Sequence, residues 1–204
     1  MHNKTYTYLA LGDSYTVGES VPLHDNFPNQ VTRLLQKKGY AFGEPTIIAK
    51  TGWTTDDLEV GIKNAITEPA SYDIVSLLIG VNNQYRGEKP ESYAWQFEEL
   101  LQQAIRFAAS DASRVFVLSI PDWGVTPFAE GRDRTAISRE IDFFNRINRD
   151  IAEKQKVHYI EITESTRDAA LAQTLVAADG LHPSANEYKR WAEKLAAAIS
   201  QQLR

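Results

Sequence analysis

Short apolar runs alternate with longer amphipathic segments along the chain. The apolar runs predict strands over residues 6–11, 46–49, 73–79, 114–120 and 157–160. Several of these runs are apolar throughout, which is typical of strands that are covered on both faces. The amphipathic segments predict helices over residues 27–38, 55–66, 90–109, 135–155 and 184–203. In the last segment apolar residues recur at helical spacing, and Pro183 suits a first helical position.

This order of elements predicts an α/β fold with three layers, in which helices cover both faces of a parallel sheet. Five strands and five helices favour a flavodoxin-like sheet with strand order 2-1-3-4-5. A chain of 204 residues fits a single domain, residues 1–204. The connection from residue 121 to residue 134 is long for such a fold, so we expect it to act as a functional lid or wall.

Ligands of such sheets bind beyond the carboxyl ends of the strands, where the strand order reverses. That point lies between the first and third strands. Polar clusters with glycine follow the first, second and third strands and precede the last helix. They are Gly12-Asp13-Ser14, Gly52, Gly80-Val81-Asn82 and Asp179-Gly180-Leu181-His182.

The first and last clusters contain a possible nucleophile and its base. A serine hydroxyl is a weak nucleophile unless a base removes its proton, and Ser14 in a strand-to-helix turn is also a normal helix cap. His182 differs from the other histidines because Asp179 precedes it by three residues. A turn brings residues i and i+3 together, so the carboxylate can orient the imidazole. The alternative is a turn-forming Asp179 and a helix-entry His182.

The two middle clusters offer hydrogen-bond donors for a developing oxyanion. The backbone N–H groups of Ser14 and Gly52, with the side-chain amide of Asn82, form a candidate oxyanion hole. Glycine at position 52 permits close approach of the backbone to a substrate. The alternatives are a plain turn glycine and an asparagine that stabilises a turn.

Taken together, the four clusters resemble the SGNH hydrolases, also called the GDSL lipase and esterase family. The resemblance spans nearly the whole chain, because the blocks occur in the family's order and at its usual separations. It implies a serine esterase that hydrolyses carboxylic esters through an acyl-enzyme on Ser14, with Asp179 and His182 completing the catalytic triad. It implies no cofactor or metal. Two positions depart from the family pattern: Tyr15 replaces the usual leucine, and Asn83 an aspartate.

The substrate is less defined than the reaction. Aromatic residues lie in or beside the predicted site loops, where they would line an acyl channel, stack on a sugar or simply pack the loops: Tyr15, Trp53, Tyr85, Trp123 and Phe128. The family includes lysophospholipases, thioesterases and carbohydrate acetylesterases. We favour a lysophospholipase or short-chain esterase, with a carbohydrate O-acetylesterase as the alternative. A non-catalytic binding module on the same scaffold is the alternative outside enzymes.

Other motifs fit the sequence less well. An α/β-hydrolase elbow requires Gly-x-Ser-x-Gly, and Thr16 occupies the position of its last glycine. A flavodoxin would share the fold, but Asp13 is unfavourable in a phosphate-binding loop. No His-Glu-x-x-His or phosphate-loop pattern occurs, so no metal site is expected.

Composition and charge limit partners and compartment. The net charge of −5 and the lack of a basic block argue against nucleic acid as a partner. The resemblance to the SGNH hydrolases implies a small ester and water instead. The absence of cysteine excludes disulfides and thiolate sites. No apolar run is long enough to span a membrane, and the N-terminus does not resemble a signal peptide. The cytoplasm is the default expectation, although a removed leader would allow a periplasmic or secreted protein. The sequence leaves the oligomeric state open.

Overall fold

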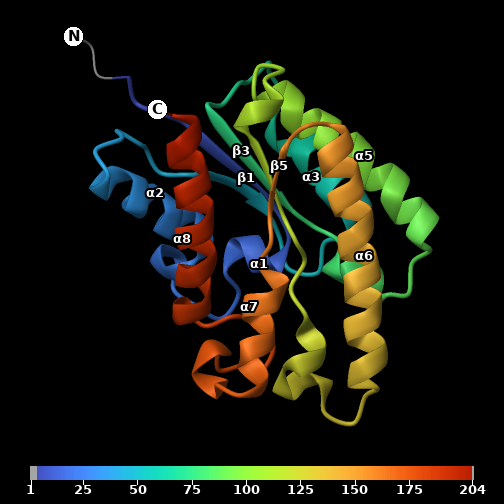
Figure 1. Cartoon of the computed structure of the whole chain (residues 1–204). Helices are drawn as coiled ribbons and strands as arrows, with labels where there is room; N and C mark the ends of the chain where they lie inside the picture. The colour runs from blue at the N-terminus through green and yellow to red at the C-terminus, as the bar shows by residue number, and fades with distance from the viewer. Residues whose placement is uncertain (1–3, 204) are drawn as a thin grey trace.

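A five-stranded parallel sheet forms the centre of the protein (Figure 1). The computed structural model describes residues 4–203, so residues 1–3 and 204 of the predicted domain lie outside the described part. The strand order is β2-β1-β3-β4-β5, which confirms the predicted flavodoxin-like arrangement. The strands are β1 (Tyr8–Gly12), β2 (Thr46–Ala49), β3 (Ile74–Leu78), β4 (Val115–Leu118) and β5 (His158–Ile160).

The apolar runs became strands because the sheet is covered on both faces. All residues of β1, β3 and β4 are buried, whereas β2 at one edge and β5 at the other are partly exposed. At the centre of the sheet, Ala10 of β1 pairs with Ser76 of β3 and with Ile47 of β2. Strand β1 is therefore an interior strand, and its carboxyl end opens at the reversal of strand order.

Five long helices form the two outer layers. Figure 1 shows α2 and α8 on one side of the sheet and α3, α5 and α6 on the other. In α8 the apolar stripe predicted from helical spacing is buried, with Trp191 against Phe27 of α2 at a ring separation of 6.2 Å. The helices are α2 (Phe27–Lys37), α3 (Thr55–Ala65), α5 (Pro90–Phe107), α6 (Arg134–Lys154) and α8 (Ala185–Gln202).

The ends of the predicted strands and long helices agree with the structure to within two residues, but the role predicted for Pro183 was wrong. Pro183 is not the first residue of the last helix, because Ser184 is the N-cap and α8 begins at Ala185. Pro183 instead forms a bridge with Val176, and the N–H of Ser184 donates to Leu175 O (2.8 Å). The bridge and this hydrogen bond hold the segment extended, which is compatible with the fixed φ of proline. They thereby set the path of the chain into α8.

Short helical turns complete the fold, and most follow the carboxyl ends of the strands. Figure 1 shows α1, α7 and the segment between β4 and α6 at this end of the sheet. The turns are α1 (Ser14–Val17), η1 (Leu23–Asp25), α4 (Val81–Tyr85), η2 (Ala112–Arg114), η3 (Trp123–Val125), η4 (Pro127–Ala129), α7 (Thr163–Arg167), η5 (Asp168–Ala170) and η6 (Gln173–Leu175). In residues 4–203 no helix is long and apolar enough to cross a membrane.

Candidate active site

Ser14 begins α1 directly after β1. Asp13 is the N-cap of this short helix, with extended backbone, and its carboxylate accepts the N–H of Tyr15 at 3.0 Å. A Cβ at Gly12 would overlap Thr16 Oγ1 and lie 2.5 Å from Leu78 O, so only glycine fits where β1 meets the turn. The turn thus places Ser14 Oγ at the carboxyl end of the sheet with only 4% of the residue exposed.

Ser14, His182 and Asp179 form a continuous line of hydrogen bonds. His182 Nε2 lies 3.0 Å from Ser14 Oγ, and His182 Nδ1 lies 2.6 Å from Asp179 Oδ2. The imidazole is buried, while the Asp179 side chain is partly exposed. This geometry lets a neutral imidazole accept the serine proton while the carboxylate fixes its tautomer. The structure brings together the three residues predicted for the triad.

A tight turn explains the spacing of Asp179 and His182. Asp179 Oδ1 accepts the N–H groups of Leu181 (2.9 Å) and His182 (3.0 Å), and Gly180 adopts a positive φ of 72°. Partial burial alone would raise the pKa of Asp179. The hydrogen bonds from His182, Ser20 and these backbone groups outweigh burial and hold the pKa well below its usual value. The carboxylate therefore stays ionised beside the imidazole.

Ser20 is a site residue that the sequence did not indicate. Its Oγ donates to Asp179 Oδ2 at 2.7 Å, the same oxygen that faces His182 Nδ1. Ser20 has a φ of 64°, a left-handed conformation that costs about 1 kcal/mol in a residue other than glycine. A serine in a polar loop carries no signal of such a contact, because the two residues are 159 positions apart.

The ring of Tyr15 packs against the imidazole of His182. Its ring centre lies 5.0 Å from that of His182 and 6.4 Å from that of Trp191 in α8. The residue is 3% exposed, and burial together with the carboxylates of Asp13 and Asp179 raises the pKa of its hydroxyl far above the usual value. A neutral tyrosine is therefore part of the pocket wall.

The three residues predicted to donate to an oxyanion, Ser14, Gly52 and Asn82, line the same pocket. Gly52 has a positive φ of 82°, and Arg86 Nη2 donates to its carbonyl at 2.6 Å. In the described chain, no backbone acceptor is found for the N–H groups of Ser14 and Gly52. The amide nitrogen of Asn82 donates to Trp53 O at 2.9 Å, with Asp13 Oδ2 3.5 Å away. These donors can stabilise negative charge that forms near Ser14.

Asp13 is a buried carboxyl group on this side of the site. The residue is 0% exposed, and burial raises its pKa from 3.8 to about 7, although the Tyr15 N–H partly opposes the shift. A buried carboxylate without a cationic partner is unfavourable, so the neutral form is favoured well above the usual pKa of an aspartate. Below about pH 7 the negative charge of the site is therefore concentrated on Asp179.

A pocket of about 180 Å³ opens beside these groups. Its walls are Ser14, Tyr15, Thr51, Gly52, Val81, Asn82, Tyr85, Trp123, Phe128, Leu181 and His182. Of the aromatic residues predicted to contact substrate, Tyr15, Tyr85, Trp123 and Phe128 line the pocket. Trp53 does not, because its ring packs against Gly61 of α3, where a Cβ would be 2.5 Å from Trp53 Cζ3. Trp53 follows Gly52 in sequence, but its ring turns away from the site because Gly61 leaves space for it on α3.

The long connection between β4 and α6 provides one wall of the pocket. It folds into the two short turns η3 and η4, which contribute Trp123 and Phe128. Rings of Tyr85, Trp123 and Phe128 contact one another at centre separations of 5.3–6.3 Å, and we call this cluster the aromatic wall. Among residues 4–203, no group of three or more His, Asp and Glu side chains is arranged to hold a metal ion.

A buried serine paired with histidine and aspartate, on a parallel sheet of this order, is the arrangement of an SGNH-type hydrolase. The model of the GDSL-like lipase/acylhydrolase family matches residues 10–190. The chain belongs to this family, whose members hydrolyse ester bonds. Among curated proteins, none is significantly similar in sequence.

Solved structures share the fold over almost the entire chain. TesA has 20% sequence identity and a TM-score of 0.74, covering 96% of this chain and 98% of its own. A lipolytic G-D-S-L family protein from Veillonella parvula has 17% identity, a TM-score of 0.74 and the same coverage. An acetylxylan esterase from Geobacillus stearothermophilus has 18% identity and a TM-score of 0.70, covering 99% and 96%. At these identities the likeness is one of fold.

The raised pKa of Asp13 predicts a pH-dependent stability effect. Between pH 3.8 and about 7 the folded protein retains a proton that the unfolded chain releases, so Asp13 lowers stability increasingly as the pH rises through this range. Asp13→Asn keeps the helix cap and removes the charge. We expect its Tm, relative to the parent, to rise by about 5 °C between pH 4 and pH 8 in thermal unfolding.

Asp73→Asn is the matched control with the opposite sign. Partial burial would raise the pKa of Asp73, but Lys4 and Thr7 lower it overall. The stabilisation from a lowered carboxyl pKa is fully present above the usual value of 3.8, so this variant should be less stable than the parent by the same amount from pH 4 to pH 8. A Tm difference for Asp13→Asn that does not change with pH would contradict a buried, proton-retaining Asp13.

The contact of Ser20 with Asp179 predicts a loss of hydrolysis rate when the hydroxyl is removed. Without it, Asp179 Oδ2 loses one of the hydrogen bonds that hold the carboxylate beside His182 Nδ1. For Ser20→Ala we expect kcat/KM, measured with a chromogenic ester, to fall about fivefold. Ser20→Gly relieves the backbone conformation and also lacks the hydroxyl, so both variants should behave alike. Loss of activity in the alanine variant alone would assign the effect to the backbone.

Proposed function

We propose that this protein is a serine esterase that hydrolyses small carboxylic esters through an acyl-enzyme on Ser14. The observation that carries the proposal is the hydrogen-bonded line Ser14–His182–Asp179, with contacts of 3.0 Å and 2.6 Å, at the wall of an open pocket. Membership of a family of ester hydrolases supports the same reaction. The roles of the individual residues are inferred from this geometry.

The proposed first step is attack of Ser14 Oγ on the ester carbonyl carbon. His182 Nε2 accepts the serine proton as the Oγ–C bond forms, and Asp179 stabilises the resulting imidazolium. The carbonyl oxygen becomes an oxyanion, which accepts hydrogen bonds from the N–H groups of Ser14 and Gly52 and from the Asn82 amide. Because the contact of Asn82 with Asp13 is long, at 3.5 Å, this N–H is available for the stronger bond to an oxyanion.

The intermediate then collapses and the ester is cleaved. His182 donates its proton to the departing alcohol oxygen, which leaves the acyl group bonded to Ser14 Oγ. A water molecule repeats the sequence: His182 removes its proton and the water oxygen attacks the acyl carbon. The bond between Ser14 Oγ and the acyl carbon then breaks, and His182 returns the proton to Ser14 Oγ. The products are a carboxylic acid and an alcohol, and no cofactor is needed for the proton balance.

The size and lining of the pocket support a short acyl group. An apolar cavity of about 150 Å³ accommodates a benzene ring, so a pocket of about 180 Å³ fits a chain of comparable size. Its aromatic and aliphatic walls favour a hydrocarbon over a polar group. We therefore propose a short-chain or lysophospholipid-type ester as the substrate.

A carbohydrate O-acetylesterase is the second candidate. Tyr85 and Phe128 are 45% and 40% exposed, so their rings are accessible for stacking on a sugar. The acetylxylan esterase of similar fold supports this alternative. Both candidates share the chemistry at Ser14 and differ only in what fills the pocket.

Replacement of the nucleophile tests the reaction. We expect Ser14→Ala to lower kcat for p-nitrophenyl butyrate by about 10⁴-fold, because the covalent step is lost. An organophosphonate should label the parent once, at Ser14, in a tryptic peptide identified by mass spectrometry. Circular dichroism of the variant should be unchanged, since the cap at Asp13 is kept. Normal turnover without Ser14 would refute the mechanism, and a parent that is neither labelled nor active would favour a binding module.

A panel of esters separates the two substrate candidates. We expect kcat/KM of p-nitrophenyl esters to rise about threefold for each added methylene up to about six carbons, and to fall for longer chains. Acetylated xylo-oligosaccharides should react at least tenfold more slowly than the best chromogenic ester. The reverse order, with an acetylated sugar as the best substrate, would establish the second candidate instead.

A further inference from the structure

An exposed arginine lies against the aromatic wall, whose three rings line the pocket. The guanidinium carbon of Arg132 is 5.3 Å from the ring centre of Tyr85, 5.3 Å from that of Trp123 and 5.2 Å from that of Phe128. All three distances are within the range of cation–π attraction. Arg132 Nη2 also donates to the Tyr85 hydroxyl at 3.3 Å. A side chain with three ring contacts has a defined position even though it is exposed.

The aromatic wall is itself held firmly in place. Trp123 Nε1 donates to Gln84 Oε1 at 2.8 Å, and Gln84 Nε2 donates to Glu140 Oε2 of α6 at 2.7 Å. The N–H of Phe128 donates to Gly180 O at 2.9 Å, in the turn that carries His182. The wall is thus fixed to α6 on one side and to the catalytic turn on the other.

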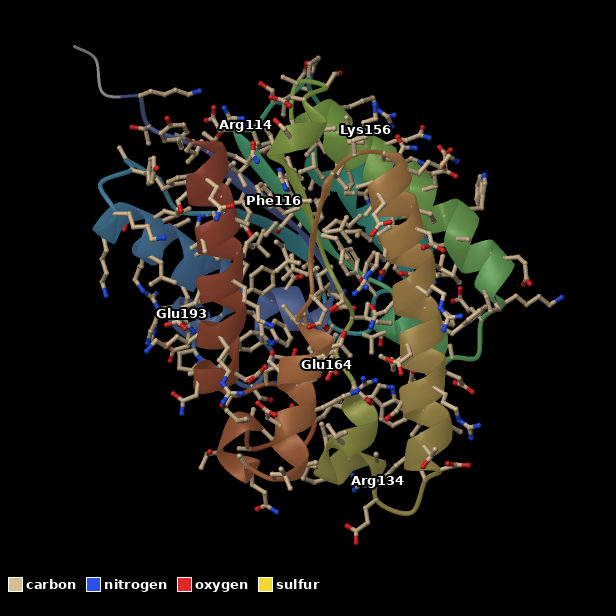
Figure 2. All side chains as sticks on the ribbon, viewed as in Figure 1. Arg114, Phe116, Arg134, Lys156, Glu164 and Glu193 are labelled. Carbon is tan, nitrogen blue, oxygen red and sulfur yellow. The ribbon has the colours of Figure 1, made fainter. Side chains whose placement is uncertain are left out.

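The backbone around Arg132 keeps the residue close to the wall. Gly131 has a positive φ of 77°, and the N–H of Arg132 donates to Ala129 O at 3.1 Å. Two residues later α6 begins at Arg134, which is labelled in Figure 2 beside this segment. The turn is short, so Arg132 reaches the rings from a nearby, anchored backbone.

Arg132 carries a charge that no acidic side chain neutralises in the described part of the chain. Some other arginines pair with carboxylates, as Arg86 does with Asp57 at 3.6 Å and Arg167 with Asp122 at 3.0 Å. A guanidinium has five N–H donors, and for Arg132 only the long contact to Tyr85 uses one of them within residues 4–203. Its charge and most of its donors therefore remain available at the rim of the pocket.

The way the guanidinium is held determines what it can bind. The contact with the rings places the guanidinium carbon over their faces and uses only one N–H, to the Tyr85 hydroxyl. The N–H groups of a guanidinium lie in its plane and match the oxygens of a carboxylate or phosphate. A cationic ligand would have to displace Arg132 from the rings, but an anion needs only the free edge. We propose that Arg132 on the aromatic wall is a binding site for an anionic group, carboxylate or phosphate, carried by the ester substrate.

This inference rests on the proposed function, since the anionic group is part of the ester that Ser14 cleaves. It adds a charge requirement to a pocket that is otherwise apolar. Attraction to an exposed guanidinium is screened by salt, so the preference for anionic esters should weaken as the ionic strength rises. An anion on the acyl side and an anion on the alcohol side are both compatible with a site at the pocket rim.

Two pairs of esters measure the preference on the two sides of the ester bond. Mono-p-nitrophenyl succinate and p-nitrophenyl butyrate differ in charge on the acyl side, and 4-acetoxybenzoate and its methyl ester differ on the alcohol side. In at least one pair the parent should favour the anionic ester in kcat/KM, and Arg132→Gln should lower that anionic-to-neutral ratio about tenfold. Arg132→Lys keeps the charge without the planar fork and should give an intermediate ratio.

Arg139→Gln is the matched control for the loss of one charge. Arg139 is exposed on α6, and its only hydrogen bond in the described chain is to Thr135 O of the same helix. This variant should keep the ratio of the parent. Titration of each pair into Ser14→Ala by calorimetry gives the binding preference without turnover, so the inference is tested even if no ester is hydrolysed.

The inference would be overturned if the parent showed no preference for the anionic ester in either pair. An equal ratio in the parent and in Arg132→Gln would overturn it as well. In either case hydrolysis of the neutral esters would leave the proposed function intact. If Arg132→Gln does not fold, the ratio in Arg132→Lys and its decrease with salt in the parent decide the question.

Discussion

The contact between Ser14 and His182 is the interaction on which the rest of the site depends. It joins residues that are 168 positions apart, one at the end of β1 and the other just before α8. The contact exists because β1 is an interior strand and α8 packs on the neighbouring face with Trp191 fully buried. Tyr15 links the two halves directly, since its ring contacts both His182 and Trp191. At this end of the sheet, the packing of the core therefore also fixes the position of His182 relative to Ser14.

The two aspartates of the site have opposite electrostatic environments. Asp179 is partly exposed and accepts hydrogen bonds from His182, Ser20 and two backbone N–H groups, which keep it ionised. Asp13 is fully buried and has a pKa of about 7 because burial penalises its charge. An ionised Asp13 beside Asn82 would repel an oxyanion, whereas an ionised Asp179 attracts the imidazolium. Below about pH 7, burial thus keeps negative charge away from the proposed oxyanion hole and leaves it on Asp179, where the proposed mechanism uses it.

Much of the architecture follows from local sequence, because apolar runs and helical stripes report burial directly. The strand order and the meeting of Ser14, His182 and Asp179 were predictable, since the carboxyl ends of parallel strands share one edge. Trp53 was a candidate for contact with the substrate, with loop packing as the alternative, and its ring fills the space left by Gly61. Ser20 was not predicted at all. In both cases the side chain's direction depends on a partner distant in sequence, which no local pattern encodes.

The segment between β4 and α6 is connected to a turn that lies far from it in sequence. Its length predicts a lid or wall, and the structure shows a wall made by η3 and η4. The hydrogen bond from Phe128 N–H to Gly180 O connects this wall to the turn that holds His182. A displacement of the wall must therefore either break this bond or move the catalytic turn. This bond therefore joins the residues proposed to contact the substrate to the turn that carries the proposed base, so the pocket wall and the proposed catalytic groups share one support.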